Sequence, residues 1–527
     1  MRLAPRLLAL PLALLAVALV YGKSLDGGYV FDDHHFVENN AAIRDLSNAP
    51  RFFYDPSTQS SVENLNSDIY RPLATLSFAA DYAVAGAAPA YSRGVNLALH
   101  ALAAALLCWL ALLAGLPGPY AAAAAAFFAL FPAGVEAVSW ISGRSAALSA
   151  VFIFSSLGFF LKGVREGGRK NFLLSLVLCA AALFTREVSV VLPLLALAWL
   201  AAARLPLKKH LAQAGLYLAL PAALFILLRF LVLGKLQQVA PPAFSPGVLA
   251  SLPFVLFAKY VEALLFPFSM LVTYSDIVEL RLEALAFYLP FSAAVCLLYA
   301  GLAAALRARG QAAAAWGLLW VPLCLLPVLN IVPIAVYMAE RFLYLPAAGL
   351  GLALAAGASA LRGHKRERAV FAAFGALLLL FAVNIQGRLA IWRDDVSLWS
   401  YDAEKNPQNF VTRVRLAEAL RAAGDRQGAY GSFQLALGLA RSRGQLAVAL
   451  NEIGSMHAAA AELEKAEGLF AAAASYKPDS HLVFYNLGKV RFLRGDQRGA
   501  RRNLERSLEL KKNYAPALEL LSHLKVK

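Results

Sequence analysis

The sequence predicts an all-α protein, in which a polytopic bundle of membrane helices is followed by a soluble α-solenoid of helical repeats. Hydrophobic residues make up 60% of the 527 positions and charged residues only 16%, whereas soluble domains are about 45–50% apolar and about 25% charged. Apolar stretches long enough to cross a bilayer recur up to about residue 390. Beyond it the sequence becomes Ala-rich, charged and periodic. We therefore expect two domains, at 1–390 and 391–527.

About eleven apolar segments are expected to span the membrane, and the first, at 7–21, is read as an uncleaved helix with a cytoplasmic N-terminus. The other ten are 94–115, 118–137, 144–162, 171–185, 188–204, 211–233, 286–306, 311–330, 343–362 and 368–388. Basic clusters near their ends orient the chain, because cytoplasmic loops are rich in Lys and Arg. Segment 250–268 is also apolar, but a crossing there would place Arg307 and Arg309 on the wrong side. We therefore expect it to be re-entrant or interfacial.

The distribution of charge argues against a nucleic-acid partner, and the positions of the cysteines argue against disulfides or a metal site. The net charge of +16 suggests nucleic acid, but many basic residues stand at the ends of apolar segments, where topology requires them. No nucleic-acid partner is expected. The four cysteines lie inside long apolar runs, which favours packing over a disulfide framework or a metal site: Cys108, Cys179, Cys296 and Cys324.

The C-terminal region has the spacing of the tetratricopeptide repeat. Small residues recur at Ala429, Ala466 and Ala500, in steps of 37 and 34 residues, and a 34-residue period is typical of that helix–turn–helix repeat. About three repeats are expected. Stacked hairpins of this kind form a scaffold that binds peptides or partner proteins.

The extramembrane loop at 23–93 carries the adjacent carboxylates Asp32 and Asp33, followed by His34 and His35. One interpretation is a general base whose pKa is set by its neighbour. Another is a divalent cation site, with Asp33 and His35 as candidate ligands. A solvated acidic turn is the third, since Asx turns are common in loops. The residues alone leave these alternatives open.

Further ionisable or polar residues stand where lipid makes them costly. The orientation places the carboxylates and arginines on the non-cytoplasmic side, together with the Asp pair. Such clustering indicates a site reached from the membrane, and arginines suit a phosphate, although some could be interfacial anchors. The candidates are Arg71, His100, Glu136, Arg144, Arg186, Glu187, Glu340, Arg341 and Tyr344.

These residues lie in an ordered set of motifs that resembles the GT-C membrane glycosyltransferases, and more closely the transmembrane-and-tetratricopeptide-repeat protein O-mannosyltransferases. The motifs are Val30-Phe31-Asp32-Asp33 with Asn39, Arg71-Pro72-Leu73, Val95-Asn96-Leu97 with His100, Pro132 with Glu136, Gly143-Arg144, Arg186-Glu187, Glu340 to Pro346 and Trp392 with Leu398. Two positions depart from the family pattern, because Phe131 replaces a usual His and Arg186 replaces a frequent Lys.

The resemblance implies that Asp33 or Asp32 is the catalytic base. It implies that Arg71, Arg144, Arg186 and Arg341 bind the phosphate or lipid of the donor. The expected supporting residues are His34, His35, His100, Glu136, Glu187, Glu340 and Tyr344. No cofactor is expected to be required, and a divalent ion at Asp33 and His35 stays open.

The expected function is therefore an inverting glycosyltransferase. It would move a sugar, mannose or another hexose, from a polyprenyl-phosphate donor to Ser or Thr hydroxyls of an extracytoplasmic protein that the repeats engage. An oligosaccharide ligase with a polyprenyl-pyrophosphate donor and a non-enzymatic membrane scaffold are the alternatives. Composition favours a bacterial inner membrane, with the site and the repeats on the periplasmic side.

Overall fold

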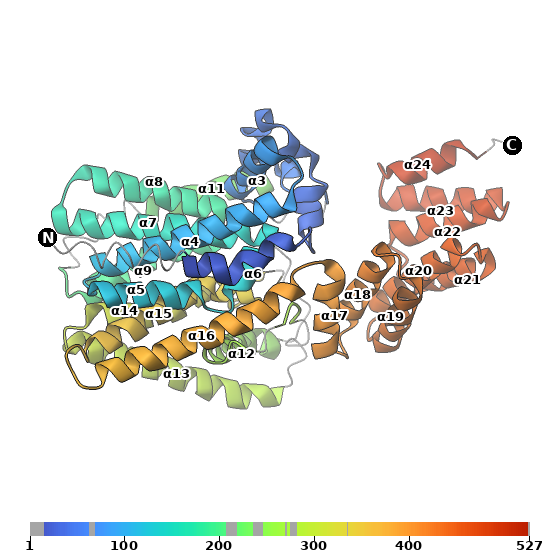
Figure 1. Cartoon of the computed structure of the whole chain (residues 1–527). Helices are drawn as coiled ribbons and strands as arrows, with labels where there is room; N and C mark the ends of the chain where they lie inside the picture. Colours follow the sequence, from blue (N-terminus) through green and yellow to red (C-terminus); the bar gives the residue numbers. More distant parts are fainter. Residues whose placement is uncertain are drawn as a thin grey trace. The chain divides into compact units, whose positions relative to one another are not determined.

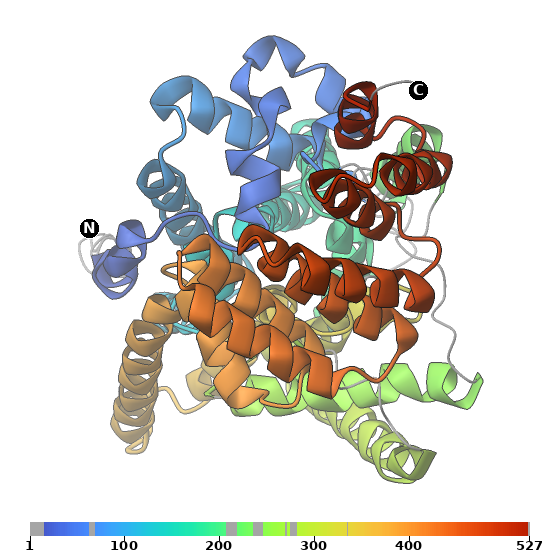
Figure 2. The ribbon, with the colours of Figure 1, turned by 90° about the vertical axis from the view of Figure 1, so that its right-hand side faces the viewer.

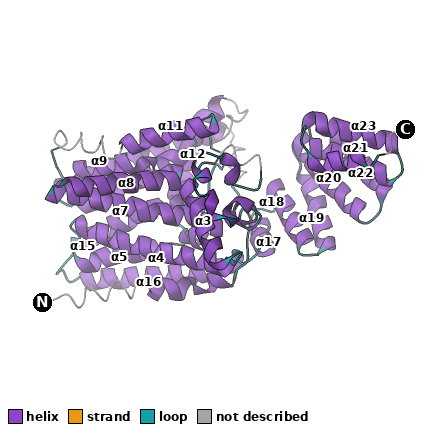
Figure 3. Ribbon diagram, turned by 90° about the horizontal axis from the view of Figure 1, so that it is seen from above, coloured by secondary structure: helices purple, strands orange, loops and turns teal. Residues whose placement is uncertain are grey.

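The computed structural model describes residues 15–62, 69–206, 215, 219–235, 246–268, 271–274, 282–334 and 336–524. These residues form helices and turns without a strand (Figures 1 and 3). The chain divides into two compact units, Met1–Asp394 and Asp395–Lys527. The predicted all-α fold, a membrane bundle and a repeat solenoid, is confirmed.

Residues 15–21 are helical, and the helices of the first unit follow. They are α3 (Pro72–Ala85), α4 (Pro89–Leu113), α5 (Gly118–Ala129), α6 (Gly134–Ser139), α7 (Arg144–Glu166), α8 (Arg169–Thr185), α9 (Leu192–Ala202), α11 (Leu220–Leu233), α12 (Pro246–Leu265), α13 (Leu282–Ala308), α14 (Ala312–Leu325), α15 (Tyr344–Ser359) and α16 (Glu367–Ile391).

Five described segments are long and apolar enough to cross a membrane, namely Pro89–Leu113, Ile141–Glu166, Phe287–Ala308, Glu340–Ser359 and Glu367–Ile391. Two of them form the centre of the bundle, because 67% of the apolar window of Ile141–Glu166 and 61% of that of Glu340–Ser359 are buried. The corresponding share is 11% for both Phe287–Ala308 and Glu367–Ile391. Helices α7 and α15 are therefore core elements, and α13 and α16 keep large apolar faces for lipid.

The structure differs from the expected spans in two places. The segment expected at 118–137 is interrupted, because α5 ends at Ala129 and α6 starts at Gly134, with Pro132, which lacks a backbone donor, between them. Residues 72–85, expected as part of a loop, form the additional helix α3. Of the segments expected at 7–21 and 211–233, residues 7–14, 211–214 and 216–218 lie outside the described residues.

Helix α12 covers most of the segment expected to be re-entrant or interfacial. Figure 2 shows it along its length, whereas α13 and α16 are strongly foreshortened in the same view. Such an orientation is expected of a helix that lies along a membrane surface. It is tied to α13 by a hydrogen bond from Ser292 Oγ to the Phe254 carbonyl oxygen, 2.9 Å long.

The described residues 22–62 of the extramembrane loop form a series of short helical turns rather than an extended excursion. Its apolar side chains pack with the start of the bundle in one cluster, whose buried members are Val37, Ile43, Phe52, Phe78, Ala79 and Ile141. The loop is thereby anchored on α3 and on the turn before α7.

The second unit consists of α17 (Asp395–Lys405), α18 (Phe410–Ala422), α19 (Arg426–Leu439), α20 (Arg443–Ala459), α21 (Leu463–Tyr476), α22 (His481–Leu493), α23 (Gln497–Leu510) and α24 (Ala515–Ser522). Its packing explains the predicted repeats. Ala429, Ala466 and Ala500 are fully buried. A Cβ on Gly454 would lie 3.0 Å from Phe470, and one on Gly488 would lie 2.9 Å from Leu504. Small residues therefore recur where two helices approach most closely.

Candidate active site

The Asp loop, residues 28–38, contains a strained residue. Phe31 has φ of 58°, a left-handed conformation that is uncommon for residues with a bulky side chain. Its ring stacks on Trp140, with 5.8 Å between ring centroids and 26° between the planes. Strain of this kind persists only where the surroundings enforce it, and it is frequent at functional sites.

Asp33 is a buried anchor of this loop. Its carboxylate accepts hydrogen bonds from the backbone N–H of Ser142 (2.7 Å), the Ser142 hydroxyl (2.6 Å) and the backbone N–H groups of Val30 (3.2 Å) and Ile141 (3.4 Å). Burial raises the pKa of Asp33 to about 6, although the Ser142 hydrogen bonds and the charge of Arg93 act in the opposite direction. Asp33 therefore fixes the loop to the turn before α7.

Asp32 is in a different environment. Its side chain is 24% exposed, and Oδ1 lies 3.4 Å from His35 Nε2. His34 bonds instead to Glu38 through Nδ1, at 2.5 Å. The two adjacent carboxylates are thus separated into a buried one and an accessible one. Within the described ranges, no group of three or more His, Cys, Asp or Glu side chains could hold a metal ion.

Two glutamates position the candidate phosphate-binding arginines. Glu187 Oε2 accepts from Arg71 Nε at 3.0 Å, and Glu187 Oε1 lies 3.5 Å from Arg229. Glu136 accepts from the backbone N–H of Arg341 at 2.7 Å and also from its guanidinium. The guanidinium of Arg341 in turn lies 5.1 Å from the ring centroid of Trp140, the residue on which Phe31 stacks. Arg341 and the Asp loop are therefore held by the same segment, Gly134–Gly143, whereas Arg71 is held by Glu187.

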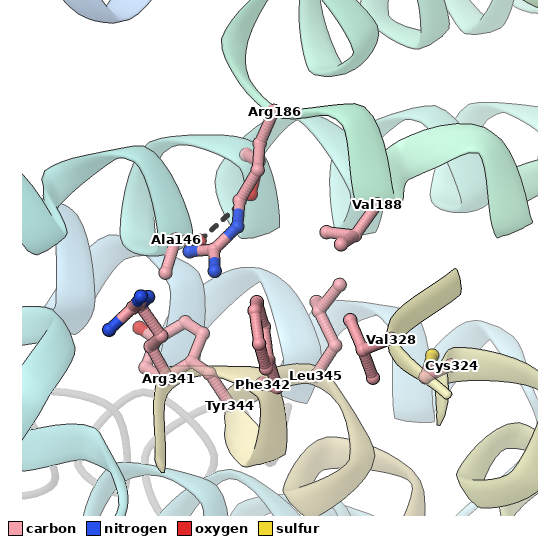
Figure 4. Close-up of a pocket in the computed structure, with 10 residues that line it drawn as sticks. Ala146, Arg186, Val188, Cys324, Val328, Arg341, Phe342, Tyr344 and Leu345 are labelled. Atoms are coloured by element: carbon pink, nitrogen blue, oxygen red, sulfur yellow. Dashed lines mark hydrogen bonds between the residues drawn. The ribbon is translucent and has the colours of Figure 1, made fainter. Parts of the chain in front are cut away.

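Arg186 occupies the centre of this arrangement. It is 2% exposed, its positive charge lies near those of Arg71 and Arg341, and its Nε and Nη1 have no hydrogen-bond partner in the described part of the chain. Both Arg186 and Arg341 line a narrow pocket with Phe342 and Tyr344 (Figure 4). A buried cluster of positive charge with unused donors is suited to an anionic group.

Comparison with known proteins points to one family. No family model matches the sequence. The chain is 25% identical over 474 residues to "Protein O-mannosyl-transferase TMTC4" of Mus musculus, an alignment that covers 78% of this chain and 64% of that protein. The chain resembles the TMTC proteins. It is 31% identical over 183 residues to "Protein O-mannosyl-transferase Tmtc1" of Drosophila melanogaster (33% of this chain, 20% of that protein) and 32% over 162 residues to the human TMTC1 (29% and 18%).

The chain thus spans 64% or less of the length of these TMTC relatives. Among solved structures, "Crystal structure of MamA" matches with a TM-score of 0.22 and 20% identity over 24% of this chain and 72% of that chain. A score this low carries no argument for the fold.

Several predicted site residues lie in hydrogen-bond networks that the chain itself completes. Arg144 is fully buried and donates to Asn96 Oδ1 (2.7 Å), to Asp81 and to the carbonyl oxygens of Ser77 (3.1 Å) and Ser92 (2.9 Å). These partners favour a structural role. Its assignment as a ligand of the donor phosphate stays a prediction.

The same holds for His100 and Glu340. His100 Nε2 faces the Ala129 carbonyl oxygen at 2.9 Å, so this nitrogen carries the proton, and Nδ1 accepts from the Tyr344 hydroxyl at 2.6 Å. Glu340 pairs with Arg388, which also donates to the Pro132 carbonyl oxygen at 2.8 Å. The His100–Tyr344 hydrogen bond and the Glu340–Arg388 ion pair both hold the start of α15 at the pocket. The supporting role predicted for these residues remains to be tested.

Sequence reasoning missed several residues that organise the site. Arg388 ends a predicted span, and Arg93 precedes one, so each looked like an interfacial charge. Ser142 and Trp140 carry no charge and follow the Glu136 motif without a recognisable pattern. The apolar residues Leu389, Ala390 and Ile391 that follow Arg388 were the one signal that could have indicated a buried partner.

Proposed function

We propose that this chain is a membrane glycosyltransferase that moves a sugar from a polyprenyl-phosphate donor to Ser or Thr hydroxyls of an extracytoplasmic protein. One observation carries the proposal. Arg186 and Arg341 line one pocket, and the buried Nε and Nη1 of Arg186 have no hydrogen-bond partner among the described residues. Trp140 contacts both Arg341 and Phe31 of the Asp loop. The similarity to proteins named protein O-mannosyl-transferases supports the same activity and makes mannose the first sugar to test.

The donor phosphate would lie between Arg71, Arg186 and Arg341. Charge-assisted hydrogen bonds from arginine to phosphate are short and strong, and they stabilise the charge that develops on the leaving group. Glu136 and Glu187 keep two of these arginines in place without neutralising the whole cluster. The polyprenyl chain would remain in the lipid beside the bundle.

Asp32 is the better candidate for the base. Asp33 is fully buried and its oxygens already accept four hydrogen bonds, which leaves it poorly placed to receive a proton from a substrate. In the proposed step, Asp32 takes the proton of the acceptor hydroxyl, and the oxygen bonds to the anomeric carbon. The bond from that carbon to the phosphate oxygen breaks, and polyprenyl phosphate departs with the electron pair. A single displacement inverts the anomeric centre.

The exit of the chain from the membrane unit supports an acceptor-binding role for the repeats. Gly28, in the Asp loop, donates from its backbone N–H to the Arg393 carbonyl oxygen at 2.9 Å. The chain therefore leaves the unit beside the Asp loop, and the repeats would begin on the same side of the membrane. We place this side in the periplasm of a bacterium, in line with the distribution of basic residues.

The test is transfer from polyprenyl-phosphate mannose to envelope proteins by the purified full-length chain, with mass spectrometry of the product. We expect Asp32→Asn to lower the rate at least about 100-fold, as loss of a general base does. Asp45→Asn is the control, because Asp45 is an exposed carboxylate of the same extramembrane loop, outside residues 28–38. Full transfer by both Asp32→Asn and Asp33→Asn would reject the catalytic assignment.

A further inference from the structure

The last residues of the membrane unit make three contacts, one with the Asp loop and two with the segments beside it. The Arg393 carbonyl oxygen accepts from Gly28 N–H, and the Trp392 carbonyl oxygen accepts from Arg93 Nη2 at 3.0 Å. The Trp392 ring packs on Trp140, with 5.9 Å between centroids and 31° between planes. The segment before Asp395 therefore joins α4, the Asp loop and the turn before α7.

Arg93 connects three backbone segments. Its side chain is fully buried, and its guanidinium donates to the carbonyl oxygens of Ser24 (3.2 Å), Gly28 (2.6 Å) and Trp392. The chain passes so close that a Cβ on Gly27 would lie 2.5 Å from Arg93 Cζ. The guanidinium bonds these carbonyls from two nitrogens held in one plane, so Arg93 fixes the start of the loop relative to the end of α16.

Trp392 is linked to Phe31 of the Asp loop through the ring of Trp140. Phe31, Trp140 and Trp392 form a continuous stack, in which Trp140 contacts both partners. Phe31 is the residue with the left-handed backbone, and Asp32 follows it directly. The stack holds Phe31 in a strained conformation. Removal of the Trp392 ring therefore allows Phe31 to relax and Asp32 to move.

We propose that Trp392 and Arg93 are positioning residues that hold Asp32 in register with the arginine pocket. Neither is a catalytic residue, because each acts through the loop. The inference rests on the proposed function for its kinetic consequence, but its structural consequence can be measured without any substrate. It also means that the residues immediately before the repeat unit set the geometry of the loop.

The experiment combines kinetics with hydrogen–deuterium exchange of the full-length protein. Trp392→Ala should lower kcat about 10- to 100-fold, the cost of a misplacement of about 1 Å, and leave the KM for polyprenyl-phosphate mannose within about threefold. The amides of residues 28–36 should exchange faster. Trp392→Phe keeps an aromatic ring and should restore both properties.

Arg393→Ala is the matched control. The Arg393 side chain is exposed, and its link to the loop is made by its backbone oxygen, so kcat and exchange should stay at the wild-type values. Arg93→Lys offers a second route if Trp392→Ala folds poorly. It keeps the charge but replaces the two donor nitrogens of the guanidinium by one, and it should also accelerate exchange in residues 28–36.

The outcomes separate this inference from the proposed function. Unchanged exchange of residues 28–36 in both Trp392→Ala and Arg93→Lys overturns the positioning role, whatever the kinetics. A rise in KM alone, with unchanged kcat, also overturns it, because that result places Trp392 in donor binding. If the wild-type protein transfers no sugar, the proposed function fails, and faster exchange in the variants still supports the positioning role.

Discussion

The guanidinium of Arg186 lies 5.7 Å from the ring centroid of Phe342 and is buried with two N–H groups that find no acceptor among the described residues. A buried donor without a partner costs about 1–3 kcal/mol, and more when it is charged. Such a cost is tolerable where a ligand supplies the acceptor. Arg186 is therefore the residue on which the proposed phosphate site depends most directly.

Replacement of Arg186 should damage transfer more than protein stability. We expect Arg186→Gln to reduce kcat/KM for polyprenyl-phosphate mannose about 100- to 1,000-fold, the usual effect of losing one donor to a developing oxyanion. Its unfolding temperature should not fall, because a buried unpaired charge is removed. Arg165→Gln, at the exposed end of α7, serves as the control. A kcat/KM of the wild-type value in Arg186→Gln would argue against this phosphate site.

The pair of Arg144 and Asp81 should behave as a structural unit. Removal of one member of a buried ion pair costs about 3–5 kcal/mol, because the other charge stays buried. We expect Arg144→Met to destabilise the protein strongly in thermal unfolding, and the double variant with Asp81→Asn to recover part of the loss. A stable Arg144→Met variant with impaired donor binding would instead favour the phosphate role that the family resemblance implies.

Asp33 should make stability depend on pH. The pKa of its carboxyl group is raised to about 6 by burial, above the value of about 3.9 in an unfolded chain. The folded state therefore binds more protons between these values, and the free energy of unfolding decreases as pH rises through this window. The contribution of Asp33 is fully present below about pH 4 and lost above about pH 6, on the order of 3 kcal/mol in all.

This effect is measured as the difference in unfolding temperature between the wild type and Asp33→Asn across pH 4 to 7. The difference should change in favour of the variant as pH rises and become level above the folded-state pKa. The comparison cancels the contributions of other carboxylates. A difference that does not vary with pH would show that Asp33 has an ordinary pKa.

The sequence was most informative where its pattern is repetitive. Apolar length and the spacing of Ala429, Ala466 and Ala500 predicted the fold class, because each element repeats one physical rule many times. It was least informative where neighbours differ in burial. Adjacent positions such as Asp32 and Asp33 look alike in the sequence, and only the contact of Asp33 with Ser142, more than a hundred residues away, distinguishes them.

The same limit explains the other differences. The gap between α5 and α6 lies in a continuous run of apolar residues, which favours a single span. Pro132 was the one local indication of a break, because proline lacks the backbone N–H of a helical hydrogen bond. The pairing of Arg388 with Glu340 depends on how α16 packs, which no local pattern contains. Charge and sidedness selected the candidate residues in the sequence, whereas the contacts of each candidate come from the structure, and their roles stay predictions.

Helices α14 and α15 pack closely beside the pocket, and Gly317 offers the most direct test of this packing. A Cβ on Gly317 of α14 would lie 2.5 Å from the backbone nitrogen of Ala353 and 2.7 Å from the carbonyl oxygen of Gly349, both in α15. Because backbone atoms cannot rotate away, Gly317→Ala must separate the two helices, at a cost of about 1–3 kcal/mol.

Gly301→Ala is the control, since nothing lies within 4 Å of its Cβ position, and the better helix propensity of alanine should stabilise it slightly. Helix α15 starts at Tyr344, just beyond the turn that holds Arg341, so Gly317→Ala should lower both the unfolding temperature and the affinity for the donor, and Gly301→Ala neither. Equal unfolding temperatures for the two variants would show that α14 and α15 do not approach this closely.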